Sequence, residues 1–181
     1  MNRSKGFMIA GASAVAISLV MTGLMEDAAL GAETASVANL CIAANGAVQV
    51  QRGTATCEAR GKGSTAIAKG LGSSATATGK HNQARALGNG STAVAGEGSN
   101  NTATARGARS SAVAGGGNNN TATARGHLSV AGAGDGNNNT ATARADASGA
   151  VAGEGNNNTA TARTKGCAAA ATTGIRPTDS C

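Results

Sequence analysis

The sequence has almost none of the large side chains from which globular proteins build a core. It contains one Phe, no Trp and no Tyr, and aromatic side chains usually supply the largest buried areas. The single Phe, Phe7, lies in an apolar N-terminal segment. The composition therefore argues against a conventional globular core. Two alternatives remain: a disordered chain rich in Ala, Gly, Asn and Thr, or a fold whose interior is built from very small side chains in register.

Residue types that carry catalysis are also scarce. The two histidines, His81 and His127, have no cysteine or acidic cluster near them in the sequence. There is no Gly-x-Ser-x-Gly nucleophile turn and no glycine-rich phosphate loop with a lysine. Single-strand nucleic-acid readers stack bases on aromatic side chains, which are missing here. We therefore predict that the protein is not an enzyme, has no catalytic residues, uses no cofactor or metal and does not bind nucleic acid.

The N-terminal segment has the pattern of a cleaved secretory signal peptide. Arg3 and Lys5 make its start positive, residues 6–25 are apolar, and small residues follow near Ala32. The apolar stretch is close to the lower limit for a membrane-spanning helix, so an uncleaved anchor is the alternative. We predict cleavage near Ala32. The mature protein would be secreted, extracellular or associated with the cell wall, and would have no stable membrane anchor.

What the chain has instead of large side chains is a repeat. The phrase Thr-Ala-Thr-Ala-Arg, preceded each time by a run of Asn, begins at Thr102, Thr121, Thr140 and Thr159. A second phrase, Ala-Val-Ala-Gly or Ala-Gly-Ala-Gly, begins at Ala93, Ala112, Ala131 and Ala150. Both recur with one fixed period of about 19 residues, which is typical of a repeat architecture. The alanine pairs divide each unit into a longer and a shorter half-repeat, and looser copies continue upstream at the shorter step.

The half-repeats predict an all-β fold. Each alternates Ala with another residue class, which is the period of a β-strand. Gly, Asn and Ser between them supply turns, and the β-branched Thr residues and frequent Gly or Asn clusters argue against a helix. Two short strands and two turns in each repeat unit predict one coil of a parallel β-solenoid, or β-roll. Its core would be lined by alanine and its ends stapled by disulfides.

The arginines decide which face of each strand points outward. Each arginine follows the two Thr residues of its repeat by two and four positions, so all three side chains point to the same side of the strand. Four stacked guanidinium groups cannot be buried unpaired. We therefore place Ala inside and predict an outer binding row of Thr102, Thr104, Arg106, Thr121, Thr123, Arg125, Thr140, Thr142, Arg144, Thr159, Thr161 and Arg163. The opposite sheet presents Val94, Val113 and Val151. We predict a self-association stripe there, with simple strand propensity as the alternative.

Four cysteines frame the repeat array. Their number is even and the chain carries a secretory signal, so we predict disulfides. Two precede the repeats and two follow them, which favours the pairs Cys41–Cys57 and Cys167–Cys181 and leaves the other two connectivities open. Each pair would staple one end, because solenoid ends expose unpaired strand edges. The chain then divides into a signal peptide (1–32), an N-terminal cap (33–62), a repeat solenoid (63–163) and a C-terminal cap or tail (164–181).

The phrases Ser-Thr-Ala-Val-Ala-Gly over residues 91–96 and Ser-Ser-Ala-Val-Ala-Gly over 110–115 resemble a known family. They are similar to the head repeats of trimeric autotransporter adhesins, the YadA-type heads, and the resemblance covers about residues 63–163. It implies a left-handed parallel β-roll on a bacterial surface that assembles as a trimer. The half-repeats of this chain are longer than those of the family, and its terminal cysteine pairs are not part of the family's pattern.

Together these features predict a secreted or surface-exposed, non-enzymatic repeat protein with a structural or adhesive role. The expected partners are an extended surface or matrix polymer and further copies of the chain, a trimer by resemblance. One alternative is an ice- or polysaccharide-binding array, because the Thr rows would be spaced about 4.8 Å between coils and about 6.7 Å along the strand. The other is a disordered, low-complexity secreted protein.

Overall fold

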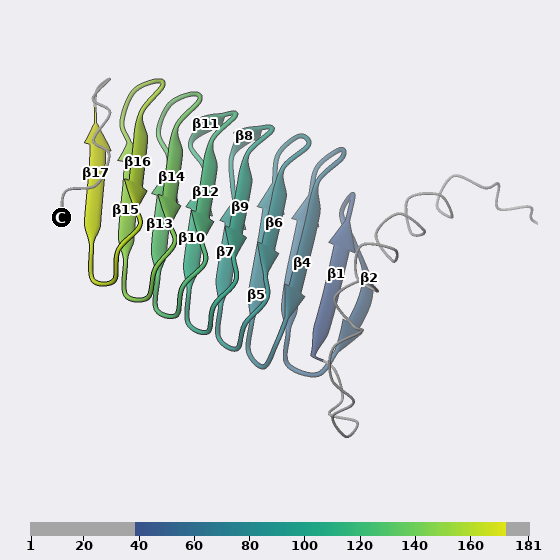
Figure 1. The fold of residues 1–181 in the computed structure, drawn as a ribbon. Coiled ribbons are helices and arrows are strands. Elements are labelled where there is room, and N and C mark those ends of the chain that lie inside the picture. Colours follow the sequence, from purple (N-terminus) through teal and green to yellow (C-terminus); the bar gives the residue numbers. More distant parts are fainter. Residues whose placement is uncertain (1–38, 173–181) are drawn as a thin grey trace, which may run out of the picture. The chain divides into compact units, whose positions relative to one another are not determined.

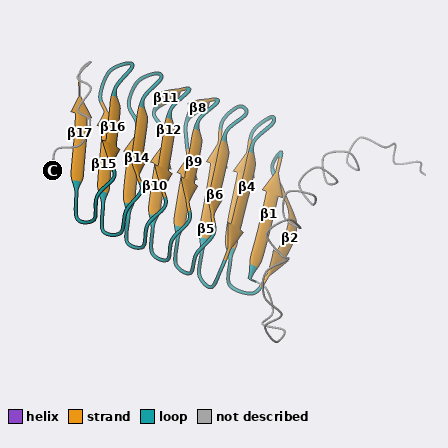
Figure 2. Ribbon diagram, in the orientation of Figure 1, coloured by secondary structure: helices purple, strands orange, loops and turns teal. Residues whose placement is uncertain are grey.

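A computed structural model describes residues 39–172, and over this range the chain winds into a parallel β-solenoid (Figure 1). Strands of successive coils stack into two long sheets joined by turns on either side (Figure 2). The predicted β-solenoid is thereby confirmed, and the disordered alternative is set aside for these residues. No helix long and apolar enough to cross a membrane occurs among them. The predicted signal peptide and Cys181 lie outside the described residues.

The eight-stranded sheet, here called the arginine sheet, runs in the order β16-β14-β12-β9-β6-β4-β1-β2. Its strands are β1 (Leu40–Ala44), β2 (Ala47–Arg52), β4 (Thr65–Lys69), β6 (Gln83–Ala86), β9 (Thr102–Ala105), β12 (Thr121–Ala124), β14 (Thr140–Ala143) and β16 (Thr159–Ala162). The seven-stranded sheet, here called the valine sheet, runs β17-β15-β13-β10-β7-β5-β3. Its strands are β3 (Thr56–Arg60), β5 (Ser74–Thr78), β7 (Thr92–Ala95), β10 (Ser111–Ala114), β13 (Val130–Ala133), β15 (Gly149–Gly153) and β17 (Ala168–Thr172).

Successive coils pair in strict register. Thr121 pairs with Thr140 in the repeat array, whereas Thr65 pairs with Gln83 in an earlier coil that is one residue shorter. The extra residue of the later coils lies in the turn that leads from the valine sheet to the arginine sheet. Two of these turns pair with each other through the short strands β8 (Gly98–Ser99) and β11 (Gly117–Asn118). The longer and shorter half-repeats of the sequence thus correspond to two turn lengths.

Alanine lines the interior, as predicted. Ala122 and Ala124 are fully buried, while Thr121 and Thr123, which alternate with them, are only half-buried. The same alternation recurs in each coil of both sheets. Protein interiors are packed like organic crystals, and two layers of methyl groups therefore allow the two sheets to approach without aromatic side chains. The exposure pattern confirms that the Thr and Arg side chains point outward.

Buried asparagines close the turn at one side of the solenoid, a feature that the sequence analysis did not predict. The side-chain amide of Asn120 donates to the carbonyls of Gly115 (3.1 Å) and Gly136 (2.9 Å). Its Oδ1 accepts from the backbone N–H of Asn139 in the next coil (3.0 Å). Buried polar groups must be hydrogen-bonded, and this row satisfies them by linking each coil to the next. Its members are Asn82, Asn101, Asn120, Asn139 and Asn158, all buried.

The three consecutive asparagines of a coil therefore have three different roles. Asn118 uses its backbone N–H to bond Oδ1 of Asn137 one coil later, forming an exposed ladder (3.0 Å). Asn119 has a φ of 57°, a left-handed conformation that Asn tolerates better than most residues. Asn120 belongs to the buried row. The run of Asn is thus explained by turn geometry and satisfied amides.

Serines occupy the corresponding corner on the other side. The Ser129 hydroxyl donates to the carbonyl of Gly126 (2.7 Å), and this bond to the residue three places earlier recurs at Ser91, Ser110 and Ser148. Cys167 takes the next position of this row, one coil after Ser148. Cys167 is disulfide-bonded, while its predicted partner, Cys181, lies outside the described residues.

The N-terminal end is closed by a β-hairpin rather than by another coil. Strands β1 and β2 are antiparallel, and β1 also pairs antiparallel with β4. The hairpin turns at Asn45-Gly46, which both have positive φ, and Asn-Gly is the strongest short hairpin signal. The Cys41–Cys57 disulfide joins β1 to β3 and so ties the two sheets together, with the Cα atoms 5.5 Å apart. This predicted pairing is confirmed.

The coils extend beyond the predicted range of residues 63–163 at both ends. Strand β3 already pairs in parallel with β5, and β17 continues the valine sheet after β15. Segments that were predicted as caps thus contribute solenoid strands. The repeat phrase is difficult to recognise in these two strands. In β3, Cys57 replaces an inward alanine, and in β17 alanine occupies both inward and outward positions.

Candidate binding surface

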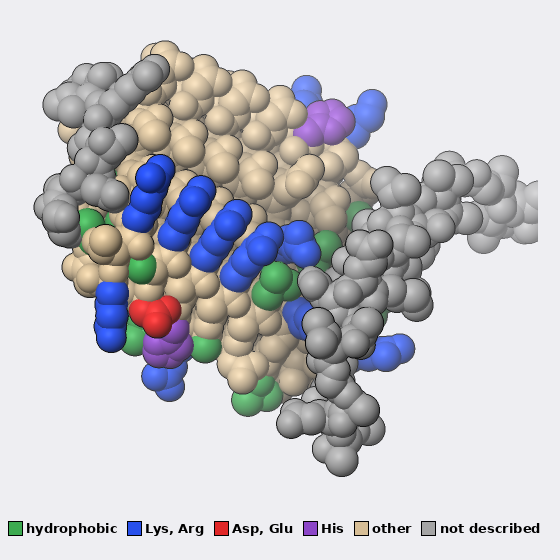
Figure 3. Space-filling model, viewed as in Figure 1, with side chains coloured by type: hydrophobic (Ala, Val, Ile, Leu, Met, Phe, Trp, Pro, Cys, Tyr) green, Lys and Arg blue, Asp and Glu red, His purple; other side chains and the backbone are tan. Residues whose placement is uncertain are grey.

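The outer face of the arginine sheet carries a regular array of polar side chains. Strands β9, β12, β14 and β16 pair Thr with Thr at two outward positions in every coil. The arginine after each strand continues the backbone ladder, since the N–H of Arg125 donates to the carbonyl of Ala143 (2.9 Å). All twelve residues of the predicted binding row therefore lie on one face. Figure 3 shows basic side chains stacked as a slanted row across such a face.

The spacing of this array is set by the sheet. Equivalent residues repeat about every 4.8 Å along the solenoid, and the two Thr rows lie about 6.7 Å apart along the strands. The Thr side chains are half-buried against their neighbours, whereas Arg106, Arg125, Arg144 and Arg163 are exposed. Guanidinium groups carry five N–H donors in a planar fork that suits carboxylate and phosphate. The face therefore offers hydroxyl groups and forked cationic donors in register.

The arginines concentrate positive charge on one side of a basic molecule. The chain has a formal net charge of +6, and an ion pair joins Glu58 to Arg60 at the N-terminal end, away from the row. Two unit charges about 4.8 Å apart in water repel each other by about 0.9 kcal/mol before screening. The repulsion between neighbours such as Arg106, Arg125 and Arg144 opposes the fold, and an anionic partner lying along the row would relieve it.

The positive row continues toward the N-terminus in a less regular form. Lys69 follows β4 at the position that arginine holds in the later coils, and Leu87 takes this position in the next coil. Arg85 of β6 is the neighbour of Thr104 of β9. The sequence analysis missed Lys69 and Arg85. The first coils are one residue shorter than the later ones, and aligning the sequence with that shorter period would have identified both residues.

The valines of the predicted self-association stripe lie on the outer face of the valine sheet. Val113 and Val151 are exposed, and Val94 is half-buried. Val130 is equally exposed on the same face and was missed, because it lies outside the repeated Ala-Val-Ala phrase. Its pairing with Ser111 and Gly149 places it in the neighbouring outward row.

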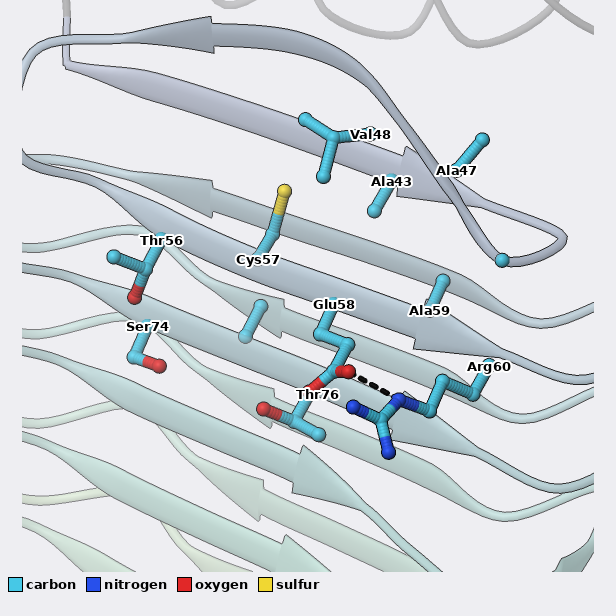
Figure 4. A pocket seen from close by; sticks show the side chains of 12 residues that line it. Ala43, Ala47, Val48, Thr56, Cys57, Glu58, Ala59, Arg60, Ser74 and Thr76 are labelled. Atoms are coloured by element: carbon cyan, nitrogen blue, oxygen red, sulfur yellow. Dashed lines mark ion pairs between the residues drawn. The ribbon is translucent and has the colours of Figure 1, made fainter.

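A groove of about 510 Å³ lies at the N-terminal end, between the hairpin and β3 (Figure 4). Small residues such as Ala43 and Ser74 line it, and its two charged side chains, Glu58 and Arg60, pair with each other. Its lining contains no histidine and no free thiol. Within residues 39–172 no group of three or more His, Cys, Asp or Glu side chains is arranged to hold a metal ion. The groove therefore offers no recognisable catalytic set.

No protein-family model, no curated protein and no solved structure matches this chain. The resemblance to YadA-type head repeats stays a prediction from the sequence phrases. The candidate surface must therefore be judged on its own geometry.

Proposed function

We propose that this protein is a secreted or surface-exposed, non-enzymatic solenoid with an adhesive or structural role, and that its arginine sheet binds an acidic polysaccharide. One observation carries the proposal: four arginines follow four in-register pairs of threonines, one set per coil, on one face. These arginine residues are exposed, and the repulsion between stacked like charges, as at Arg106, Arg125 and Arg144, opposes the fold. Their recurrence is best explained by a partner that repeats as the coils do.

The binding would be multivalent. Each guanidinium can hold one carboxylate through two parallel N–H bonds, and the adjacent Thr hydroxyls can donate to or accept from sugar hydroxyls. A single contact of this kind is weak at an exposed site. Contacts along one chain add, because the first one raises the effective concentration for the next. An extended acidic polymer lying along the solenoid axis would use all four coils.

The test is binding of an acidic polysaccharide, polygalacturonate, compared with a neutral polysaccharide, dextran. We expect the wild type to bind only the acidic polymer, and the variant with Arg106, Arg125, Arg144 and Arg163 all replaced by Gln to lose at least about a hundredfold in affinity. A single Arg125→Gln change should cost only about threefold.

A charge-matched control variant distinguishes binding by the arginine row from binding that depends only on the net charge of the protein. Lys62, Lys80, Arg109 and Lys165 are exposed and lie outside the strands, and replacing these four by Gln removes the same net charge. We expect this variant to bind as the wild type does. Equal losses in the two fourfold variants would contradict the proposed surface, and loss of all binding on one substitution would indicate a discrete site.

A second candidate is binding to ice or to a crystalline polysaccharide through the Thr rows. The observation in its favour is two straight rows of half-exposed Thr, in register over four coils. Inhibition of ice recrystallisation by the wild type, retained in the fourfold Arg→Gln variant and lost in Thr123→Lys, would support it. Absence of inhibition by the wild type would remove ice from consideration.

A further inference from the structure

The outer face of the valine sheet is uncharged over most of its length. From β5 to β17 every outward residue is Ser, Thr, Val, Gly or Ala. Charged residues occur on this face only on β3, as Glu58 and Arg60. A basic protein thus keeps one broad face free of charge and places an arginine row on the other. The valine sheet is the face on which two copies can meet without bringing like charges together.

Two glycines on this face are not required by the backbone or the packing of the monomer. Gly132 and Gly149 lie in regular strands with unbroken register. Neither has a left-handed φ, and a Cβ added to either would meet nothing within 4 Å. Glycine weakens a strand and, where no bulge or bend is present, often marks a site that a ligand or another backbone approaches closely. These two glycines therefore indicate a close external contact.

The exposed valines and the small residues alternate between two neighbouring outward rows. Along one row lie Ser111, Val130 and Gly149, and along the other lie Val113, Gly132 and Val151. On β10, β13 and β15, each strand thus carries one valine and one small residue, two places apart. The valines are 44–49% exposed. The face has projections and hollows of matching size.

We propose that this face binds a second copy of the chain, giving a side-by-side dimer about a two-fold axis that runs parallel to the solenoid between the two rows. Such an axis exchanges the two rows and leaves each strand opposite its own copy. Val130 then lies opposite Gly132 of the other copy, with Val151 opposite Gly149 and Val113 opposite Ser111. On these three strands each valine meets a small residue, as a self-complementary two-fold interface requires, whereas on β7 Val94 lies opposite Thr92. The arginine sheets face outward on opposite sides of the dimer.

The size of the face predicts a reversible dimer. Six strands about 4.8 Å apart and about five residue positions of about 3.3 Å give a face of roughly 480 Å². Two such faces bury roughly 950 Å², below the roughly 1,600 Å² of a standard stable interface. We therefore expect a dissociation constant between about 10 µM and 1 mM. The dimer would carry two polymer-binding faces, but its existence does not depend on the proposed polymer.

The experiment is sedimentation velocity of the mature, oxidised protein over a concentration series up to on the order of 1 mM. Gly132→Val fills the hollow opposite Val130, and we expect it to weaken dimerisation at least about tenfold. The double variant Val130→Gly/Gly132→Val exchanges projection and hollow without changing composition. We expect it to restore the dissociation constant to within about threefold of the wild type.

Because the added Cβ meets open space, Gly132→Val should fold, with a melting temperature equal to or above that of the wild type. Thr123→Val on the arginine sheet is the matched control and should leave dimerisation unchanged. A monomeric wild type at the highest concentration, a trimer, or an unaffected Gly132→Val variant would overturn the proposal. Failure of the double variant to restore association would overturn the two-fold pairing.

Discussion

The two outer faces of this solenoid stand on the same alanine scaffold and differ in almost every side chain that points away from it. One face repeats Thr, Thr and Arg in each of four coils, and the other alternates Val with Gly or Ser. The interior of both consists of buried alanines. Because packing constrains only the inward positions, the residue types at the outward positions can differ between the two sheets according to what each sheet binds. The contrast between the faces is therefore more informative about partners than the fold is.

The largest expected effect contrasts the inside of the arginine sheet with its outside. Ala122→Arg forces a charge into a space filled by methyl groups and should cost about 5 kcal/mol or more, enough to prevent folding of the repeats. Thr123→Arg, one residue later and outward, should change stability by no more than about 0.5 kcal/mol. Thermal unfolding followed by circular dichroism measures both. Equal tolerance of the two changes would contradict the orientation of the strand.

An intermediate effect is expected at the turn that joins the two sheets. Asn120→Ala leaves the Gly115 and Gly136 carbonyls and the Asn139 N–H without their side-chain partner, and should cost about 3 kcal/mol. Asn119→Ala keeps its backbone bonds and loses only a residue suited to positive φ, which should cost about 1 kcal/mol. Urea unfolding of the two variants makes the comparison. A larger loss at Asn119 than at Asn120 would show that backbone conformation, and not the buried row, holds the turn.

The smallest effect separates the faces by their response to salt. Raising ionic strength from about 0.05 M to about 0.5 M should weaken polymer binding by the arginine sheet about tenfold, because exposed charges are screened within a few ångströms. Self-association through the uncharged part of the valine sheet, from β5 to β17, should not weaken, because the hydrophobic contribution does not depend on charge. Binding and sedimentation measurements at the two ionic strengths provide the test. A parallel loss of both would indicate that the same charged surface serves both contacts.

The sequence alone was sufficient to predict the coil, the direction of its side chains and one disulfide. The alternation of Ala with Thr fixes strand period and parity locally, so Ala122 and Thr123 could be assigned to opposite sides without any structure. The outward row Thr102, Thr104 and Arg106 followed from the same parity. The pairing of Cys41 with Cys57 followed from the position of these residues before the repeats, because loop closure favours near partners.

Other features depend on what lies one coil away, and local pattern does not reveal that. Asn118, Asn119 and Asn120 are the same residue type in a row, yet one bonds the next coil at the surface, one adopts a left-handed turn and one is buried. Only the stacking of coils distinguishes them. The Asn45-Gly46 hairpin signal was present in the sequence, within the segment predicted as the N-terminal cap, but the sequence analysis did not assign a hairpin to it.

The sequence by itself determined a β-solenoid with an alanine interior. That outcome requires only the repeat length and the alternation of inward and outward residues along a strand, and both can be seen in a short stretch of sequence. The tertiary structure decided which polar residues are buried at the corners, where the coils begin and end, and that Val130 shares a face with Val113 and Val151. These relations arise between residues about one coil apart, and they exist only once the backbone hydrogen bonds between strands have fixed the register.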